Sequence, residues 1–287
     1  MPQTEFALDD GDHVGNDHPL MLIAGPCVIE SLEMSIEVAS RLRELCLGFG
    51  VHYVFKSSYD KANRSSVDSY RGPGLKRGLA ILAEVKRQTE VHVLTDVHDV
   101  SQVEPAAAVV DILQVPAFLC RQTDLLTAVA KSGRVVNVKK GQFMAPWDML
   151  NVWRKLQQGG CERAFVTERG ASFGYNNLVV DFRSILWFRD NGMPVCFDAT
   201  HSVQLPGGQG TASGGQRQYV AGLSSAAVAL GIAALFWEVH PDPDKALCDG
   251  PNQLALDAVP PLLERLVELD RWAKSEAHNA AEMAESS

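Results

Sequence analysis

Short apolar runs alternate along the chain with longer segments in which apolar residues recur at helical spacing. Runs rich in β-branched and aromatic residues predict strands, and they lie at residues 20–26, 53–58, 91–96, 112–116, 135–140, 164–170, 195–201 and 235–240. Apolar residues three or four positions apart predict helices between them, most clearly at residues 33–49, 74–90, 125–131 and 147–158. Strands that alternate with helices in this way are typical of a parallel sheet covered by its helices.

The number of predicted strands favours a closed barrel. Eight parallel strands close the (β/α)8 TIM barrel, an α/β fold of about 250 residues, and this chain has 287. A doubly wound open sheet is the alternative, but no GxGxxG sequence follows an early strand, as its dinucleotide-binding version requires. We therefore expect a single catalytic barrel domain at 19–273, between a flexible, acidic N-terminal arm at 1–18 and a C-terminal tail at 274–287 that frays from the last helix.

The composition of the chain argues against a nucleic-acid-binding, secreted or membrane-spanning protein. The net charge of −9 gives no overall basic surface that would attract nucleic acid. The six cysteines are scattered without CxxC spacing, and the N-terminus does not read as a secretory signal, which favours reduced thiols in the cytoplasm. The longest apolar stretch, residues 226–237, is shorter than the roughly 20 residues that cross a bilayer. We expect a cytoplasmic protein that binds neither nucleic acid nor membrane.

The ends of the predicted strands carry the polar chemistry. In a (β/α)8 barrel, catalytic groups lie at the carboxyl ends of the strands. Nearly every predicted end carries a charged group or a metal-ligand type, and these residues are Cys27, Lys56, Asp96, Gln114, Lys139, Glu168, Arg169, His201 and Glu238. This predicts a polar site on one rim of the barrel.

One group on this rim has the side chains of a metal site. Cys27, His201 and Glu238 belong to the first, seventh and eighth strands, which are neighbours in a closed barrel, and Asp249 follows the eighth. A thiolate, an imidazole and two carboxylates suit Zn²⁺, Fe²⁺ or Mn²⁺. The alternative is that Cys27 is a core residue, His201 a hydrogen-bonded loop residue and Glu238 the partner of a salt bridge.

A second group is cationic. It comprises Lys56, Lys61, Arg64, Lys139, Lys140 and Arg169, from the second, fifth and sixth strands and their loops. Since the protein is acidic overall, cations gathered at one face predict a site for phosphates or carboxylates. Solvated surface charge is the alternative, although Lys139 directly ends an apolar run. Asp96 and Glu168 would pair with these cations or position the hydroxyl group of a substrate.

At this point the sequence resembles the 3-deoxy-D-manno-octulosonate 8-phosphate synthases over roughly residues 20–270. The motif KANRSS at 61–66 is the most specific, because the related synthase of the shikimate pathway is expected to show a KPRTS-type motif there. The other matching motifs are IAGPCVIES (23–31), YRGPGL (70–75), TDVHD (95–99), DILQVPAFLCRQTDLL (111–126), NVKKGQF (137–143), ERGASFGYNNLVVD (168–181), FDATHSVQ (197–204) and EVHPDPDKALCDGP (238–251).

The resemblance implies a reaction between two small phosphorylated substrates. Phosphoenolpyruvate, D-arabinose 5-phosphate and water would give the eight-carbon keto-sugar phosphate and inorganic phosphate, for lipopolysaccharide. The implied phosphoenolpyruvate ligands are Lys56, Lys61, Gln114, Lys139 and Arg169. The implied ligands of the pentose phosphate are Asn63, Arg64, Ser65 and Asp96. Lys61, Asp96, Lys139 and His201 are the implied catalytic residues.

The resemblance also implies a metal and an assembly. The metal-dependent class carries Cys at the position of Cys27, where the metal-free class carries Asn, so a divalent ion on Cys27, His201, Glu238 and Asp249 is expected. Such an ion would polarise the aldehyde, orient the sugar or activate the water, and these roles remain open. A homotetramer is implied, with Arg121 reaching a neighbour's site. The alternatives are the shikimate-pathway synthase acting on erythrose 4-phosphate, a metal-dependent aldolase, and an inactive barrel that serves as a scaffold.

Overall fold

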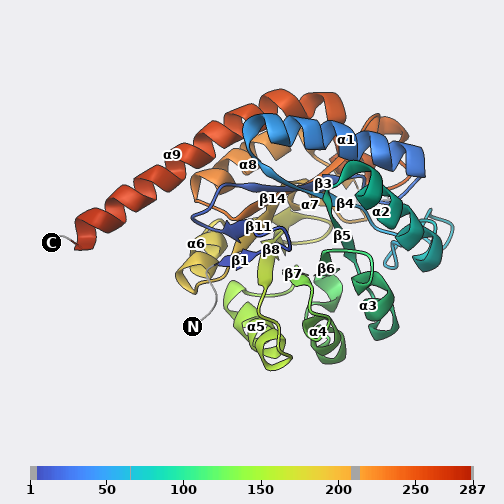
Figure 1. The fold of residues 1–287 in the computed structure, drawn as a ribbon, viewed down its shortest axis with the longest axis horizontal. Coiled ribbons are helices and arrows are strands. Elements are labelled where there is room, and N and C mark those ends of the chain that lie inside the picture. The colour runs from blue at the N-terminus through green and yellow to red at the C-terminus, as the bar shows by residue number, and fades with distance from the viewer. Residues whose placement is uncertain (1–4, 65, 208–213, 286–287) are drawn as a thin grey trace.

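The computed structural model describes residues 5–64, 66–207 and 214–285, and it contains a closed barrel of eight parallel strands (Figure 1). The barrel strands are β3 (Met21–Gly25), β4 (His52–Lys56), β5 (His92–Asp96), β6 (Ile112–Val115), β7 (Val135–Lys139), β8 (Ala164–Glu168), β11 (Val195–Asp198) and β14 (Ala234–His240). Each strand pairs with the next, and β14 pairs in parallel with both β11 and β3. The predicted (β/α)8 fold is confirmed, and the open sheet is wrong.

Helices surround the barrel (Figure 1). They are α1 (Leu32–Phe49), α2 (Leu75–Thr89), α3 (Val100–Ala107), α4 (Thr123–Ala130), α5 (Met149–Gln158), α6 (Arg183–Asp190), the short α7 (Ala199–Ser202), α8 (Val220–Ala229) and α9 (Val259–Glu285). Residues outside the barrel strands form the short strands β1 (Glu5–Ala7), β2 (His13–Gly15), β9 (Ala171–Ser172), β10 (Leu178–Val179), β12 (Gln204–Leu205), β13 (Gly214–Gly215) and β15 (Leu254–Ala255). None of the described helices is long and apolar enough to cross a membrane.

Local sequence sets the helix ends, as α1 illustrates. Ser31 precedes the helix in an extended conformation, and its side chain accepts a hydrogen bond from the backbone N–H of Met34, which satisfies a donor that has no partner within the helix. Gly50 ends the helix with φ of 69°, a left-handed conformation that glycine adopts without steric cost. Between these ends, Val38, Leu42 and Cys46 form the buried face that packs on the barrel.

The strands divide the core into two layers because successive side chains point to opposite faces of a strand. In β3, Leu22 and Ala24 face the surrounding helices, whereas Met21 and Ile23 face the interior of the barrel. The same alternation places Phe165 and Phe236 inside. These apolar residues fill the amino-terminal half of the barrel, which leaves the carboxyl ends of the strands free for polar groups.

The expected flexible arm at residues 1–18 is wrong for the part that the structure describes. β1 and β2 form an antiparallel hairpin that covers the amino-terminal end of the barrel. Phe6 is 1% exposed and stacks on Phe165 with ring centroids 5.4 Å apart, and Val14 is fully buried beside it. The hairpin is ordered because two apolar side chains on one of its faces complete the interior layer of the barrel.

The acidic residues of the hairpin account for its charge. Asp9 pairs with Arg134 and Arg163 at 3.2 and 2.7 Å, and Asp10 pairs with His92 at 2.6 Å. The carboxylates that suggested a flexible arm therefore form ion pairs with cationic side chains at the amino-terminal end of the barrel. The C-terminal tail also differs from the expectation, because α9 continues to Glu285 and extends past the barrel (Figure 1).

His92 makes the attachment of the hairpin sensitive to pH. Asp111 and Asp10 raise the pKa of His92 to about 9, against the opposing effect of burial. The ordinary pKa of histidine is about 6.5, so the folded protein binds this proton more tightly than the unfolded chain. The resulting stabilisation is complete below about pH 6.5 and disappears as the pH rises through 9.

We expect the free energy of unfolding to fall by about 1–2 kcal/mol between pH 7 and pH 9.5 through His92, allowing for solvent around its partner. Urea denaturation at several pH values measures this change. His92→Asn, which cannot be protonated in this range, is expected to flatten the profile. An equal fall in stability in wild type and His92→Asn would show that other groups cause it.

Candidate functional site

A cavity of about 430 Å³ opens at the carboxyl ends of the barrel strands. Its lining includes five cationic side chains, Lys56, Lys61, Arg64, Lys139 and Arg169, against two carboxylates, Asp96 and Asp249. The cavity has the size of a small-molecule site. Because cations outnumber carboxylates on its wall, it is suited to an anionic ligand.

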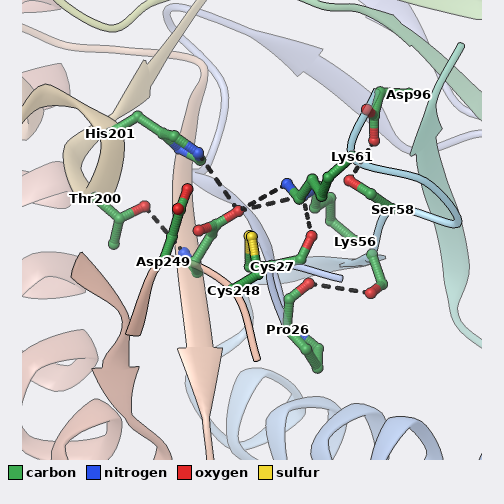
Figure 2. A network of polar contacts seen from close by, with 12 residues as sticks. Pro26, Cys27, Lys56, Ser58, Lys61, Asp96, Thr200, His201, Cys248 and Asp249 are labelled. Carbon is green, nitrogen blue, oxygen red and sulfur yellow. Dashed lines mark hydrogen bonds and ion pairs between the residues drawn. The ribbon is translucent and has the colours of Figure 1, made fainter. Parts of the chain in front are cut away.

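Glu238 lies at the centre of the polar network. It is fully buried in β14, and one carboxylate oxygen, Oε1, lies 3.4 Å from Lys56 Nζ, 3.6 Å from Lys61 Nζ and 3.4 Å from His201 Nε2. Figure 2 shows His201 and Lys61 on opposite sides of the network, and both lie within 3.6 Å of Glu238 Oε1. Burial by itself would raise the pKa of Glu238. The positive charges of His201, Lys61 and Lys56 have the larger, opposite effect and lower the pKa to about 2. The carboxylate is therefore ionised at neutral pH.

Asp198 orients two of the groups that were predicted from sequence. It ends β11, and its Oδ2 lies 2.7 Å from His201 Nδ1 and 2.6 Å from Lys139 Nζ. Its Oδ1 accepts hydrogen bonds from the backbone N–H of His201 and from the Thr200 hydroxyl. His201 and Lys139 hold the pKa of the buried Asp198 carboxyl well below its usual range. With Nδ1 engaged by Asp198, the other ring nitrogen of His201, Nε2, faces the cluster around Glu238.

The four predicted metal ligands fall into two overlapping groups that share Asp249. His201, Glu238 and Asp249 form one, and Cys27, Cys248 and Asp249 form the other, with ligand atoms in each within 4.8 Å of one another. The salt-bridge alternative accounts for Oε1 of Glu238 and for Nδ1 of His201. It leaves Glu238 Oε2 buried without a hydrogen-bond partner among the described residues, and a buried acceptor of this kind is costly. The donors therefore fit a divalent ion.

Cys27 faces a second thiol that the sequence did not single out. The Sγ atoms of Cys27 and Cys248 are 2.8 Å apart, and both residues are buried. Burial and then the Cys248 thiol raise the pKa of Cys27 well above its usual value. In the apo protein the thiol is thus protonated at neutral pH, whereas a bound cation would favour the thiolate.

Two arginines on the cavity wall have different partners. Arg169 donates from Nη2 to Gln204 Oε1 at 3.0 Å, and its Nη1 is buried without a partner among the described residues. Arg64 donates from Nη1 to Asp249 Oδ1 at 3.3 Å and contacts the Cys248 sulfur at 3.1 Å. Arg169 therefore has a free donor for an anion, while Arg64 is paired with a candidate metal ligand.

Asp96, at the end of β5, is held on both sides. Its Oδ1 accepts a hydrogen bond from Ser58 Oγ at 2.5 Å, and its Oδ2 lies 2.9 Å from His98 Nε2. Burial opposes ionisation, but His98 and Lys56 keep the pKa of Asp96 well below its usual range. Nearby, Gln114 donates to the side chain of Asn137 at 2.7 Å, which fixes its amide at the cavity wall.

Most of the predicted site residues come together at this cavity. Its lining contains Lys56, Lys61, Asn63, Arg64, Asp96, Gln114, Lys139, Arg169, His201 and Asp249, and Cys27 and Glu238 are buried in contact with this set. Ser65 lies outside the described residues. Lys140 was expected among these cations, but it is buried beside Glu168 at 3.4 Å and is not on the cavity wall. Arg121 is an exposed turn residue.

Several side chains at the site had no role predicted from the sequence. They include Ser58 and His98, which hold Asp96, Asp198, which faces His201 and Lys139, Cys248, which faces Cys27, and Gln204, which binds Arg169. Ser58 and Cys248 stand close to assigned residues in the sequence, and His98 lies in the TDVHD motif. Gln204 belongs to the short strand β12, for which the apolar pattern gave no signal.

Comparisons with known proteins show the family to which the chain belongs. The model of the DAHP synthetase I family matches residues 4–275. Proteins named 2-dehydro-3-deoxyphosphooctonate aldolase are similar over most of the chain. The one from Geobacter sp. (strain M21) is 60% identical over 91% of this chain and 95% of its own length. The one from Aromatoleum aromaticum is 60% identical over 96% and 98%, and the one from Trichlorobacter lovleyi is 61% identical over 90% and 94%. The resemblance inferred from the motifs is confirmed, and the chain belongs to the DAHP synthetase I family.

Proposed function

We propose that this protein is a transferase that condenses phosphoenolpyruvate with D-arabinose 5-phosphate and water. The products are 3-deoxy-D-manno-octulosonate 8-phosphate and inorganic phosphate. The observation that carries the proposal is the cavity wall with five cations, built from the motifs that resemble the octulosonate synthases. The shared name of the relatives supports the eight-carbon product over the erythrose 4-phosphate reaction of the sister synthase.

Phosphoenolpyruvate binds at the deep cationic end of the cavity in this proposal. Lys61, Lys139 and Arg169 hold its phosphate and carboxylate, with Lys56 and Gln114 behind them. Burial opposes the charge of Lys61, but the ionised carboxylate of Glu238 raises its pKa, so Lys61 remains a cation. Two anionic groups about 4 Å apart repel by about 4 kcal/mol at an effective dielectric constant near 20. The second anionic substrate therefore needs these fixed cations.

The pentose phosphate binds at the outer part of the cavity, with its phosphate at Asn63, Arg64 and Ser65. Asn63 and Arg64 line the cavity, which supports this placement, and the role of Ser65 remains a prediction from the motif. Asp96 accepts a hydrogen bond from a sugar hydroxyl, because it is ionised and fixed by Ser58 and His98. Arg64 contacts Asp249 through Nη1, and its buried Nε has no partner among the described residues, so it retains donors for a phosphate.

A divalent ion, Zn²⁺, Fe²⁺ or Mn²⁺, would be held by Cys27, His201, Glu238 and Asp249. The unpartnered Oε2 of Glu238 and the clustering of these donors support this assignment. When bound, the ion supplies a positive charge that orients the sugar and polarises its aldehyde. Asp198 Oδ2 faces Nδ1 of His201 at 2.7 Å, which leaves Nε2 as the atom that would bind the ion.

The reaction that the site supports has two additions and one elimination. C3 of phosphoenolpyruvate forms a bond to the sugar aldehyde, and water adds to C2. Phosphate then leaves from C2 by cleavage of its C–O bond. Lys139 and Arg169 stabilise the charge on the phosphate and carboxylate, and Asp96 positions the sugar. The buried position of Lys139 limits its contact with water, which strengthens its interaction with the substrate.

We also propose that the protein assembles as a homotetramer in the cytoplasm, with Arg121 at an interface between subunits. Large apolar side chains near the rim support an interface, since Phe118, Phe143 and Trp147 are 56, 58 and 61% exposed. The six cysteines are free thiols, as a reducing compartment requires.

The release of inorganic phosphate from phosphoenolpyruvate tests the proposed reaction. We expect release with arabinose 5-phosphate and little with erythrose 4-phosphate at the same concentration. Mass spectrometry of the product should show the eight-carbon keto-sugar phosphate. Release only with erythrose 4-phosphate would assign the sister reaction. Cleavage of a sugar phosphate without release of phosphate would assign an aldolase, and tight substrate binding without turnover would indicate a scaffold.

A further inference from the structure

A second cluster of metal-ligand side chains lies at the opposite end of the barrel from the cavity. Glu5, His13 and His18 come from the N-terminal hairpin and the turn that follows it. One carboxylate oxygen and one ring nitrogen from each histidine all lie within 4.8 Å of one another. None of these three residues lines the cavity of the candidate active site.

The hairpin register explains why these side chains meet. Phe6 pairs with Val14, and both point into the barrel. Because side chains alternate along a strand, Glu5 and His13 lie on the opposite, outer face of the hairpin. They occupy diagonal positions, since Glu5 pairs with Gly15, and diagonal neighbours are within reach of long side chains.

The turn brings His18 to the same place. Its backbone N–H donates to the Gly15 carbonyl at 3.2 Å, which folds the chain back over the end of β2. Its own carbonyl accepts a hydrogen bond from Lys274 Nζ of α9. The backbone of His18 is therefore fixed by hydrogen bonds to both the hairpin and the last helix, independently of the contacts of its side chain.

The ligand atoms of Glu5, His13 and His18 already lie close together without a bound ion. Glu5 uses one carboxylate oxygen toward each histidine, with Oε1 3.3 Å from His13 Nδ1 and Oε2 in contact with His18 Nε2. The two imidazole rings have centroids 5.7 Å apart. Ligand atoms on a tetrahedral Zn²⁺ with bonds near 2.0–2.1 Å are about 3.3–3.4 Å apart. To close around an ion, ligand atoms that now lie within 4.8 Å of one another would therefore have to approach by at most about 1.5 Å.

We propose that Glu5, His13 and His18 bind a divalent transition cation, with Zn²⁺ as the best fit. Two imidazoles and one carboxylate select Zn²⁺ over Mg²⁺ or Ca²⁺, which prefer oxygen ligands. The side chains of Glu5, His13 and His18 are 44, 54 and 35% exposed, so the ion enters from solvent and water completes its coordination. The bound ion links β1, β2 and the segment that leads into β3, and it stabilises the cap on the barrel.

Metal stoichiometry tests this site without using catalytic activity as the readout. Chelator-treated protein is dialysed against excess Zn²⁺ and analysed for metal and protein. His13→Gln combined with His18→Gln is expected to bind one equivalent less than wild type, whatever the occupancy of the catalytic site. His52→Gln is the matched control, because His52 pairs with Asp12 of the same cap at 2.7 Å but lies outside the cluster. It should bind as much metal as wild type.

Two further readouts separate this site from the one at Cys27. Co²⁺ bound at the hairpin site has no sulfur ligand, so the equivalent of Co²⁺ that the double histidine substitution removes should carry no thiolate charge-transfer band. Zn²⁺ at about a hundredfold excess over the Kd of the hairpin site should raise the unfolding temperature by about 4 °C more in wild type than in the double histidine variant.

Equal metal content in wild type and the double histidine variant would overturn the proposal. Phosphate release from that variant is expected to match wild type, because the cluster is remote from the cavity, and this shows that the barrel is folded. If the double variant does not fold, the metal content of Glu5→Gln tests the proposal instead. Glu5→Gln with the full wild-type metal content would also overturn the proposal.

Discussion

Replacing Lys139 by Met is expected to lower kcat/KM for phosphate release by about 10³-fold. Lys139 is 7% exposed at the end of β7, and its ammonium group lies 2.6 Å from Asp198 and 4.0 Å from the centre of the Phe236 ring. Methionine fills a similar volume but removes the positive charge that faces the anionic substrates. It also leaves the buried Asp198 carboxylate with one cationic partner fewer, which disturbs the position of His201.

Steady-state kinetics with phosphoenolpyruvate and arabinose 5-phosphate measure this loss, and circular dichroism shows whether the barrel remains folded. Lys76→Met is the matched control, because Lys76 is an exposed residue of α2 away from the cavity. It should retain wild-type kinetics. A Lys139→Met protein that is folded and within tenfold of wild type would remove Lys139 from the proposed catalytic residues.

Removal of the metal is expected to give the other large effect. Treatment with a strong chelator should lower phosphate release at least about 100-fold, and Zn²⁺, Mn²⁺ or Fe²⁺ should restore it. The reason is that the carboxylates of Glu238 and Asp249 lose a shared cation, and the Cys27 sulfur is left with the Cys248 thiol as its neighbour. Unchanged activity after complete removal of metal would support the proposed reaction but contradict the proposed metal dependence.

Cys27→Asn refines this test. If the ion acts mainly by positioning the aldehyde and its neighbouring hydroxyl, an amide at this place should leave measurable activity that a chelator no longer affects. Complete loss of activity in a folded Cys27→Asn protein would show that the ion is needed for the chemistry itself. Cys161→Ser is the control, since Cys161 is partly exposed after α5 and far from the ligand groups in the fold. It should respond to chelator as wild type does.

The barrel strands could be predicted closely because parallel strands are buried on both faces. Such strands read as continuous apolar runs, and the prediction of residues 135–140 matches β7 to within one residue. The strand predicted for residues 195–201 was too long. Asp198 accepts a hydrogen bond from the backbone N–H of His201 and starts the short helix α7. That capping contact is local, but the apolar pattern does not reveal it.

The hairpin could not be predicted from its own residues. Phe6 and Leu8 belong to an apolar run of only three residues and Val14 stands alone, and their burial depends on Phe165 and the rest of the interior layer. The pairing of Asp96 with His98 and Ser58, and that of Cys27 with Cys248, likewise depend on distances across the barrel. The motifs could place the strand-end residues at one rim, but not their individual partners.

The hairpin has a consequence for the order in which the chain folds during synthesis. Its residues leave the ribosome before the barrel strands, yet the surface that Phe6 covers is complete only when β14, the last barrel strand, has closed the barrel against β3. The Lys274 contact to His18 forms later still. The hairpin is therefore made before the barrel but reaches its native place after it. Until then its apolar face is open to chaperones or to other nascent chains.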